Sequence, residues 1–227
     1  MDFLKVTTTS KKTVIESFDK IANKLFYDYQ LQVNHNYYRL IDIEFYYYTD
    51  DLTDTHKDIY IHKHLTQRHS AKWYFHDSGI DITFGNNSDH YGGILIRGIA
   101  KIEKAKIDNN FITSQIHGPI KVRSEITESF NNVFDNSPNV FCLFEINNEL
   151  EGSCMPAPLY VVKTNRINLN PQKDNEERYF DSKYRYVILL DKCQFGYTNK
   201  TQIAKDLQNQ YDLTREEVNK LLGSKFL

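Results

Sequence analysis

Two carboxylates and a tyrosine alternate along the segment YYRLIDIEFYYY, residues 37–48. The run is rich in β-branched and aromatic residues, a composition typical of a strand. With a period of two, Asp42, Glu44 and Tyr46 share one face of that strand. The other face carries Ile41, Ile43 and Phe45. We expect the apolar face to pack on a core and the carboxylates to face a cleft, where a general base could act, or solvent, where they would have no chemical role.

A helix and a β-hairpin are predicted around this strand. Ser10 is suited to cap a helix that ends near Tyr29. Its buried face would carry apolar residues at helical spacing, namely Val14, Phe18, Ile21 and Leu25. A turn at residues 34–36 follows a short apolar run at residues 31–33, so the Glu44 strand is expected to be the second arm of the hairpin.

Residues 49–72 are polar and hold four histidines among several cations. Imidazole and aspartate side chains suit zinc, but no spacing here matches a known zinc pattern, so we expect no metal site. The histidines are His56, His62, His64 and His69, and the cations are Lys57, Lys63, Arg68 and Lys72. Such a segment is suited to contact phosphate groups locally.

Arg97 interrupts the apolar strand GILIRGI, residues 93–99. A buried unpaired guanidinium is very costly, so Arg97 needs a partner, for which Glu44, Asp42 or a ligand are candidates. The alternative is an edge position from which the side chain reaches water.

The remaining chain reads mainly as strands and two C-terminal helices. Trp73 and Phe75 share one face of a strand. Further strands are expected at residues 110–116, 118–122, 140–146, 159–165 and 184–190, with a short helix beginning near Ser124. The C-terminal helices are expected at residues 203–212 and 214–222, and Thr214 with Glu217 forms a capping box for the second.

Composition limits the classes of function. The chain has 227 residues, a net charge of -2 and a pI near 6.4, so nucleic-acid contacts would have to come from local patches. Cys142, Cys154 and Cys193 form no C-x-x-C pair, which favours a reducing compartment. The sequence has neither a leader pattern nor an apolar run of membrane-spanning length. We therefore expect a cytoplasmic monomer that is not bound to a membrane and needs no cofactor.

The order of these segments resembles the alkyladenine (3-methyladenine) DNA glycosylase family. The helix around IANKLF leads into YRLIDIEFYY, whose Glu-x-Tyr places Glu44 at the family's water-activating carboxylate and Tyr46 at an aromatic residue that packs against the flipped base. His56, in DTH, matches a histidine that follows shortly afterwards. YFHDSG resembles the family's Met-Phe pair followed by Pro-Gly, and GILIRGI resembles its apolar strand with one arginine, here Arg97. HGPIKV resembles its Gly-Pro-x-Lys turn, here with Lys121.

This resemblance covers roughly residues 15–145. It implies an α+β fold in one domain, built on a curved, mostly antiparallel sheet with flanking helices, with residues 1–195 glycosylase-like and residues 196–227 an appended helical pair. It also implies a DNA-repair hydrolase that flips a damaged or modified purine out of DNA and releases it with carboxylate-activated water. Glu44 would be catalytic. The base would be bound by Tyr46, His56, Trp73, Phe75 and Arg97, and nucleic acid by Lys57, Lys63, Arg68, Lys72 and Lys121.

The chain departs from the family in two ways. Between YFHDSG and GILIRGI it is shorter, so no tyrosine stands at the position of the hairpin wedge that enters the minor groove. Phe84, His90 and Tyr91 are possible substitutes. The overall charge is also acidic. The shortened hairpin predicts a preference for single-stranded or destabilised substrates. The alternative function is a non-catalytic or repurposed nucleic-acid-binding module of the same fold. A metal hydrolase using the histidine cluster is the third candidate.

Overall fold

The fold is known from a computed structural model, which describes residues 2–7, 10–49, 56–87, 89–104, 110–146, 160–174, 178–190 and 196–223. The strands are β1 (Tyr29–Val33), β2 (Asn36–Thr49), β3 (Ser70–His76), β4 (Gly79–Phe84), β5 (His90–Lys104), β6 (Asn110–His117), β7 (Phe141–Glu145), β8 (Tyr160–Thr164) and β9 (Arg185–Leu189). The helices are α1 (Lys11–Asp28), α2 (Pro119–Glu128), α3 (Lys200–Tyr211) and α4 (Arg215–Leu222), with short 3₁₀ turns η1 (Asp2–Leu4), η2 (Leu65–Arg68), η3 (Pro171–Lys173) and η4 (Tyr179–Asp181).

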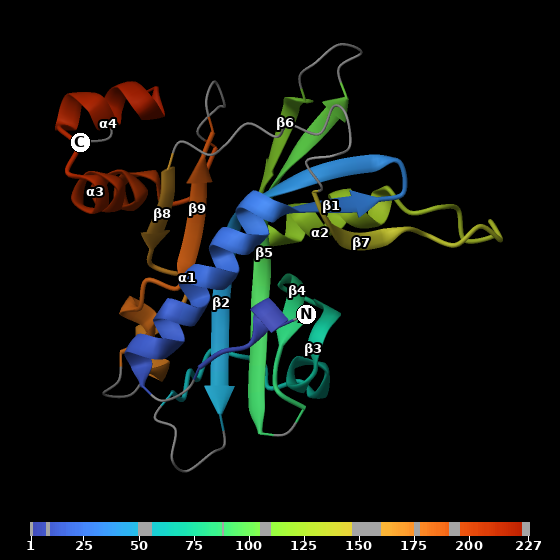
Figure 1. The fold of residues 1–227 in the computed structure, drawn as a ribbon, viewed down its shortest axis with the longest axis horizontal. Coiled ribbons are helices and arrows are strands. Elements are labelled where there is room, and N and C mark those ends of the chain that lie inside the picture. The colour runs from blue at the N-terminus through green and yellow to red at the C-terminus, as the bar shows by residue number, and fades with distance from the viewer. Residues whose placement is uncertain are drawn as a thin grey trace.

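These strands form one curled antiparallel sheet with β2 at its centre (Figure 1). The long strand β5 pairs with almost the whole of β2 along one edge. Along the other edge, β1 pairs with the start of β2 and β9 pairs with its middle. The order β3-β4-β5-β2-β1-β7 is completed by β6 beside β5 and by β8 beside β9. The predicted α+β class and antiparallel sheet are confirmed at this level.

Helix α1 crosses one face of the sheet (Figure 1). Its N-cap is Ser10, whose hydroxyl accepts a hydrogen bond from the N–H of Thr13, as a serine cap should. The predicted apolar positions Val14, Phe18, Ile21 and Leu25 are all fully buried. Phe18 stacks on Phe45 of β2 with ring centres 4.5 Å apart, so this helix fixes which face of β2 turns toward the core.

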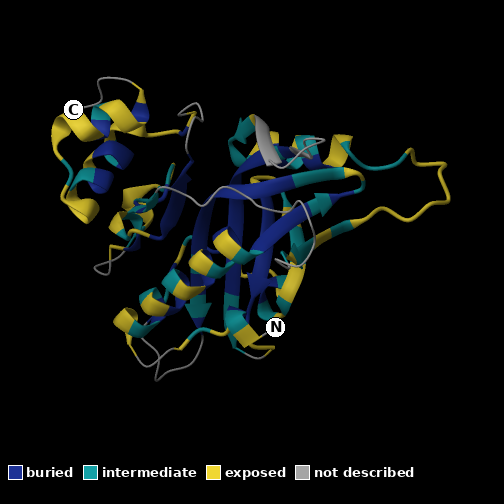
Figure 2. Cartoon of the chain, turned by 45° about the horizontal axis from the view of Figure 1, so that its top comes forward, coloured by how far each residue is buried: buried dark blue, intermediate teal, exposed yellow. Residues whose placement is uncertain are grey.

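Both faces of β2 are buried, and the darkest part of Figure 2 lies over the central strands. The expectation that Asp42 and Glu44 face a cleft or solvent directly is wrong, because they are 3% and 0% exposed. The β2–β5 register shifts on both sides of Asp42, which indicates a bulge there. A strand paired along both edges and covered on both faces must give its carboxylates partners within the protein.

The segment GPIKV is helical, so the prediction that it continues the β pattern is wrong. Gly118 has φ of 104°, a conformation that favours glycine, and it turns the chain out of β6. Pro119 occupies the first helical position of α2, where its fixed φ and missing N–H are tolerated. The helix predicted near Ser124 therefore begins five residues earlier, at Pro119.

The predicted C-terminal helical pair is present as α3 and α4, at the upper left of Figure 1. Helix α3 covers the edge strand β8. The amide of Gln210 both accepts from the N–H and donates to the C=O of Lys163, and Tyr211 bonds Val161 in the same way. These side chains satisfy an edge that would otherwise be open to pairing. Ile203, Leu207 and Val218 belong to the same hydrophobic cluster as the sheet.

Candidate functional site

A pocket of about 570 Å³ lies on the face of the sheet opposite α1. Phe45 contacts α1, so its neighbour Tyr46 points to the other face, and Tyr46 lines the pocket. The volume is within the range of ordinary small-molecule sites, roughly 300–1,000 Å³. Its polar lining includes Tyr46, Tyr60, His62, Gln67, His76, Asp77, Asp81, Arg97, His117 and Lys121.

Glu44 lies directly beneath this pocket. Its Oε2 accepts hydrogen bonds from the hydroxyl of Tyr46 at 2.8 Å and from Nη1 of Arg97 at 3.3 Å. Its Oε1 accepts from the N–H of Ile167 at 3.0 Å. All three donor residues line the pocket, so every group bonded to the Glu44 carboxylate belongs to a residue at the pocket. The partner that Arg97 requires is therefore Glu44, one of the candidates that the sequence offered.

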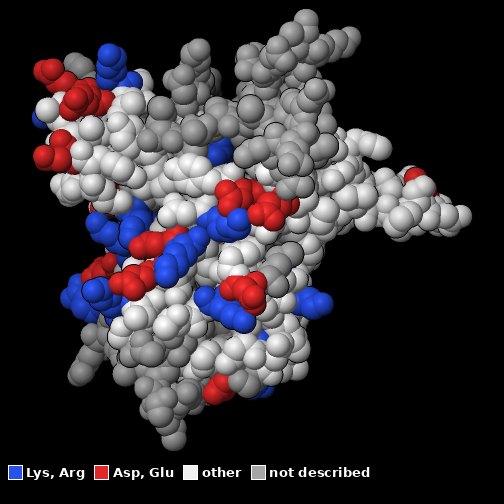
Figure 3. Space-filling view, in the orientation of Figure 1, with Lys and Arg blue, Asp and Glu red and all other residues white. Residues whose placement is uncertain are grey.

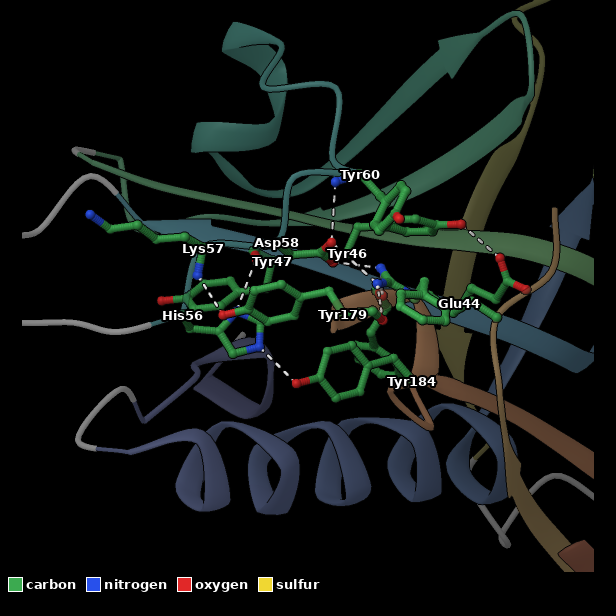
Figure 4. Close-up of polar contacts among 12 residues, drawn as sticks. Glu44, Tyr46, Tyr47, His56, Lys57, Asp58, Tyr60, Tyr179 and Tyr184 are labelled. Carbon is green, nitrogen blue, oxygen red and sulfur yellow. Dashed lines mark hydrogen bonds and ion pairs between the residues drawn. The ribbon is translucent and has the colours of Figure 1, made fainter. Parts of the chain in front are cut away.

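Arg166 supports the opposite side of Tyr46. Its fully buried guanidinium donates to both carboxylate oxygens of Asp58, and its central carbon lies 4.6 Å from the centre of the Tyr46 ring. Burial opposes the charge of Arg166, but the neighbouring acidic groups, Asp58 first and then Glu44, together outweigh that effect and the pKa of Arg166 is raised. Burial, followed by the nearby carboxylate of Glu44, raises the pKa of Tyr46 well above its ordinary value. Tyr46 therefore remains a hydrogen-bond donor at neutral pH. Figure 4 shows Asp58, Tyr46 and Glu44 within this network.

A second polar cluster is formed by Gln67, His76 and Asp81. Asp81 is buried in β4, and its two oxygens accept from Nε2 of His76 and from Nε2 of Gln67, both at 3.0 Å. His62 stands edge-on to His76 with ring centres 4.6 Å apart. Burial, and then the neighbouring His76, lower the pKa of His62, so this imidazole is neutral at pH 7.

The rim of the pocket is formed by the start of α2. Gly118, Pro119, Ile120 and Lys121 all line it, and the side chain of Lys121 is exposed. His117, the last residue of β6, lies beside them, and burial lowers its pKa. Among the five cations predicted to bind nucleic acid, Lys121 is therefore the one that lines this pocket.

His56 lies in the aromatic core rather than in the pocket. It is 1% exposed, its Nε2 lies 2.9 Å from the hydroxyl of Tyr184, and its Nδ1 lies 3.0 Å from the C=O of Tyr47. Figure 4 shows His56 above α1, between tyrosines. The structure does not bring His56, which the resemblance implies to be base-binding, to the lining of the pocket.

Trp73 and Phe75 share one face of β3, as predicted, but it is the face that turns away from the pocket. Trp73 stacks on Phe141 at 4.2 Å and lines a separate apolar pocket of about 160 Å³. Phe75 lies 5.8 Å from the same ring and is largely exposed. The alternate residue His76 lines the larger pocket instead. Neither Trp73 nor Phe75 is placed where it would contact a molecule in that pocket.

Two of the predicted cations lie beside a pair of tyrosines. Tyr48 and Tyr91 face each other across β2 and β5 on the pocket side of the sheet, with ring centres 6.3 Å apart. Nζ of Lys63 lies 3.1 Å from the centre of the Tyr48 ring, and the guanidinium of Arg68 lies 5.3 Å from that of Tyr91. We call these four residues the Tyr48–Tyr91 surface. Cations interleaved with aromatic rings are suited to binding nucleic acid.

The other predicted cationic positions are placed differently. Lys57 forms a β-bridge with Tyr48, and its N–H donates to the hydroxyl of Tyr179. Lys72 lines the small apolar pocket beside Trp73. A further basic segment, KIEKAK at residues 101–106, lies partly outside the described residues. On the α1 face, acidic and basic side chains are interspersed (Figure 3), for example in the pairs Lys12–Glu16 and Lys24–Asp28.

Of the three wedge candidates, only Tyr91 lies on the pocket side. Phe84 is 3% exposed and packs against Phe18 and Tyr47 in the core. His90 places its Nδ1 2.8 Å from the hydroxyl of Tyr47, which points toward α1. Phe84 is therefore not available to enter a base stack.

Several residues at the site were not found by sequence reasoning, namely Asp58, Gln67, His76, Asp81 and Arg166. Asp81 offered a usable signal, because a single carboxylate inside the apolar run GIDITF needs a partner just as Arg97 does. Arg166 offered none, since it follows β8 in the sequence and meets Asp58 only through the fold.

Comparison with known proteins gives no family. No family model matches the chain, and no solved structure matches it. The chain is similar to "Uncharacterized protein L759" of Acanthamoeba polyphaga mimivirus, with 24% identity over 210 residues, covering 75% of this chain and 85% of the viral protein.

Two further observations concern only the residues that the structure describes. None of their helices is both long and apolar enough to cross a membrane. No three of their histidine, cysteine, aspartate or glutamate side chains are grouped so as to hold a metal ion. Cys142 is a free thiol, whereas Cys154 and Cys193 lie outside the described residues.

Proposed function

We propose that this chain is a DNA glycosylase that hydrolyses the N-glycosidic bond of a damaged or modified purine, and that its fold is related to the alkyladenine DNA glycosylases. The observation that carries the proposal is the cluster of Glu44, Tyr46 and Arg97 directly beneath a pocket large enough for a nucleoside. The resemblance selects these three residues as well, together with others that the structure places away from the pocket, such as His56 and Trp73.

The proposed chemistry uses Glu44 as general base. Cleavage of an N-glycosidic bond gives the sugar oxocarbenium character, so a nearby carboxylate can both deprotonate water and stabilise the positive charge. A base within a duplex is shielded, so it must be flipped into the pocket before it can react. The Tyr48–Tyr91 surface and Lys121 would contact the strand on either side of the flipped nucleotide.

The mechanism requires one local rearrangement. Glu44 is fully buried in the structure, and Tyr46 and Arg97 lie between it and the pocket. We propose that the phosphate of a bound nucleotide draws the Arg97 guanidinium away from Glu44 and exposes Oε2 of Glu44 to the attacking water. Catalytic hydrogen bonds often take their final geometry only in the substrate complex.

The complete burial of Glu44 favours a second candidate, a nucleic-acid-binding module that does not catalyse hydrolysis. Three donors already occupy the carboxylate, and this is also an arrangement that stabilises a core. In that case the pocket would hold a base without releasing it.

Incubation with oligonucleotides that carry several base lesions separates the two candidates. We expect abasic sites to form with the native protein and no abasic sites with Glu44→Gln, which keeps the volume of the side chain but replaces one accepting oxygen with a donating amide. Circular dichroism of Glu44→Gln at the assay temperature checks that the variant is folded, because the substitution also removes the charge that pairs with Arg97. Glu128→Gln, at an exposed position near the end of α2, is the control and should retain full activity. Binding without abasic-site formation by the native protein would support the non-catalytic module, whereas full activity of Glu44→Gln would remove Glu44 from the mechanism.

A further inference from the structure

The cluster of Gln67, His76 and Asp81 is a built site within the same pocket. Their side chains come from η2, β3 and β4, and all three residues line the pocket. Only 8% of the His76 side chain and 5% of the Asp81 side chain are exposed, and Gln67 is buried. Polar groups buried to this degree need defined partners, and here they bond one another in a fixed pattern.

The hydrogen-bonding direction of the cluster is determined by its neighbours. The Oε1 of Gln67 accepts from the N–H of His64 at 3.1 Å, so the amide nitrogen of Gln67 is the group that donates to Asp81. Nε2 of His76 faces the other oxygen of Asp81, which places the proton of a neutral imidazole on Nε2. Nδ1 of His76 is then an acceptor, and it has no hydrogen-bond partner among the described residues.

The missing side chain of Gly93 provides the space for the hydrogen bond between Gln67 and Asp81. A Cβ atom on Gly93 would lie 2.6 Å from Oδ2 of Asp81 and 2.8 Å from Nε2 of Gln67. With any larger residue at position 93 the end of the Asp81 or Gln67 side chain would have to move, so glycine preserves the bond between them. The glycine on β5 is thus explained by the polar cluster, since the strand itself would be better served by a larger residue.

Arg97 and the cluster of Gln67, His76 and Asp81 offer the pocket opposite hydrogen-bonding roles. Arg97 donates hydrogen bonds, whereas Asp81 accepts them. Both oxygens of Asp81 already take one bond each, which leaves a second lone pair on each for a ligand. Tyr46, Tyr60 and Leu95 supply flat and apolar lining between these groups. A ligand complementary to this pocket is a flat ring system that presents a hydrogen-bond donor to Asp81.

We propose that Asp81 is a specificity-determining residue that accepts a hydrogen bond from the exocyclic amino group of an aminopurine, as found in adenine. The choice of a nucleobase as the ligand rests on the proposed function. The assignment of an acceptor subsite rests on the geometry of Gln67, His76 and Asp81. A hydrogen bond to a charged acceptor contributes more than a neutral one, so a base that lacks the amino group leaves Asp81 poorly satisfied and binds less tightly.

Calorimetric titration of the full chain with free adenine and with unsubstituted purine tests this proposal. The two probes differ at the amino group, so the comparison does not depend on the folding of any variant. We expect adenine to bind at least about tenfold more tightly than purine. In Asp81→Asn this ratio should fall to about threefold or less, because a neutral amide is a weaker acceptor. Glu128→Gln, which removes a charge from an exposed side chain outside the lining of the pocket, should keep the full ratio.

Each outcome has a separate meaning for the two proposals. Equal affinity for adenine and purine, or no binding of either, overturns the assignment of Asp81 even if the protein releases damaged bases. A tenfold preference that survives in Asp81→Asn also overturns it. Conversely, if adenine is preferred through Asp81 but no oligonucleotide yields an abasic site, the subsite is correct and the proposed catalytic function is wrong.

Discussion

Arg185 of β9 and Asp42 of β2 form two parallel hydrogen bonds, with Nε 2.8 Å from Oδ1 and Nη2 2.7 Å from Oδ2. Burial opposes the charge of Arg185, but Asp42 outweighs it and the pKa of Arg185 is raised. The guanidinium also donates to the C=O of Thr198. This pair therefore connects the centre of the sheet to the segment that leads into α3.

Asp42→Asn is expected to destabilise the protein by about 3–5 kcal/mol, because it leaves the buried charge of Arg185 without its partner. The measurement is the free energy of unfolding in urea. Glu145→Gln, which removes one partner of the exposed Lys24 pair, is the control and should change stability little. At a temperature where Asp42→Asn is folded, it should lose less base-releasing activity than Glu44→Gln. Native stability in Asp42→Asn would show that the pair contributes nothing to the fold.

Nucleic-acid affinity is expected to be modest and to fall steeply with salt, because the favourable cations are local patches on an acidic chain. Lys121→Ala should weaken binding and reduce the slope of log affinity against log salt by about one. Lys63→Ala, in the Tyr48–Tyr91 surface, should act similarly. Lys12→Ala, on the α1 face shown in Figure 3, is the control and should bind like the native protein. Fluorescence anisotropy titrations at several salt concentrations measure both quantities, and affinity independent of salt would argue against these contacts.

Base release is expected to be faster from single-stranded or mismatched substrates than from a fully paired duplex. Extruding a paired base costs a few kcal/mol, and Phe84 is held in the core where it cannot replace the base in the stack. The measurement compares one lesion in a single strand, opposite a mismatch and opposite its normal partner. The rival expectation is that Tyr91 acts as the wedge. In that case the paired duplex is cleaved at least as fast, and Tyr91→Ala slows that substrate selectively.

Stability is expected to fall as the pH is lowered from about 7 toward 5. The pKa of His117 is lowered chiefly by burial, so the folded state holds this imidazole neutral at a pH where the unfolded chain binds a proton. The unfolded state then binds more protons, and folding loses free energy as the pH falls below about 6.5 toward the lowered pKa value. Melting temperatures measured across this range test the prediction. His117→Asn should flatten the dependence, while replacement of the exposed His35 should leave it unchanged.

Local periodicity was sufficient for much of the architecture. The helix capped by Ser10, the hairpin turn at residues 34–36 and the strand that carries Glu44 were all predicted, because their signals lie within a few neighbouring residues. The need of Arg97 for a partner was also predicted, since the cost of burying a charge does not depend on the fold. The prediction was wrong where one local pattern is compatible with more than one secondary structure. The β-branched residues of GPIKV suggested a strand, but a helix begins at Pro119.

Only the tertiary structure decided which side chains meet at the pocket. The alternation in WYFH shows that Trp73 and His76 lie on opposite faces of β3, but the pairing of β3, β4 and β5 selects the face that turns toward Glu44. Asp42 and Arg185 are 143 positions apart, and Asp58 and Arg166 are 108 apart. Partners at such separations are chosen by the packing of the whole sheet, because a single sequence carries the spacing of near neighbours but no record of which distant segments pair.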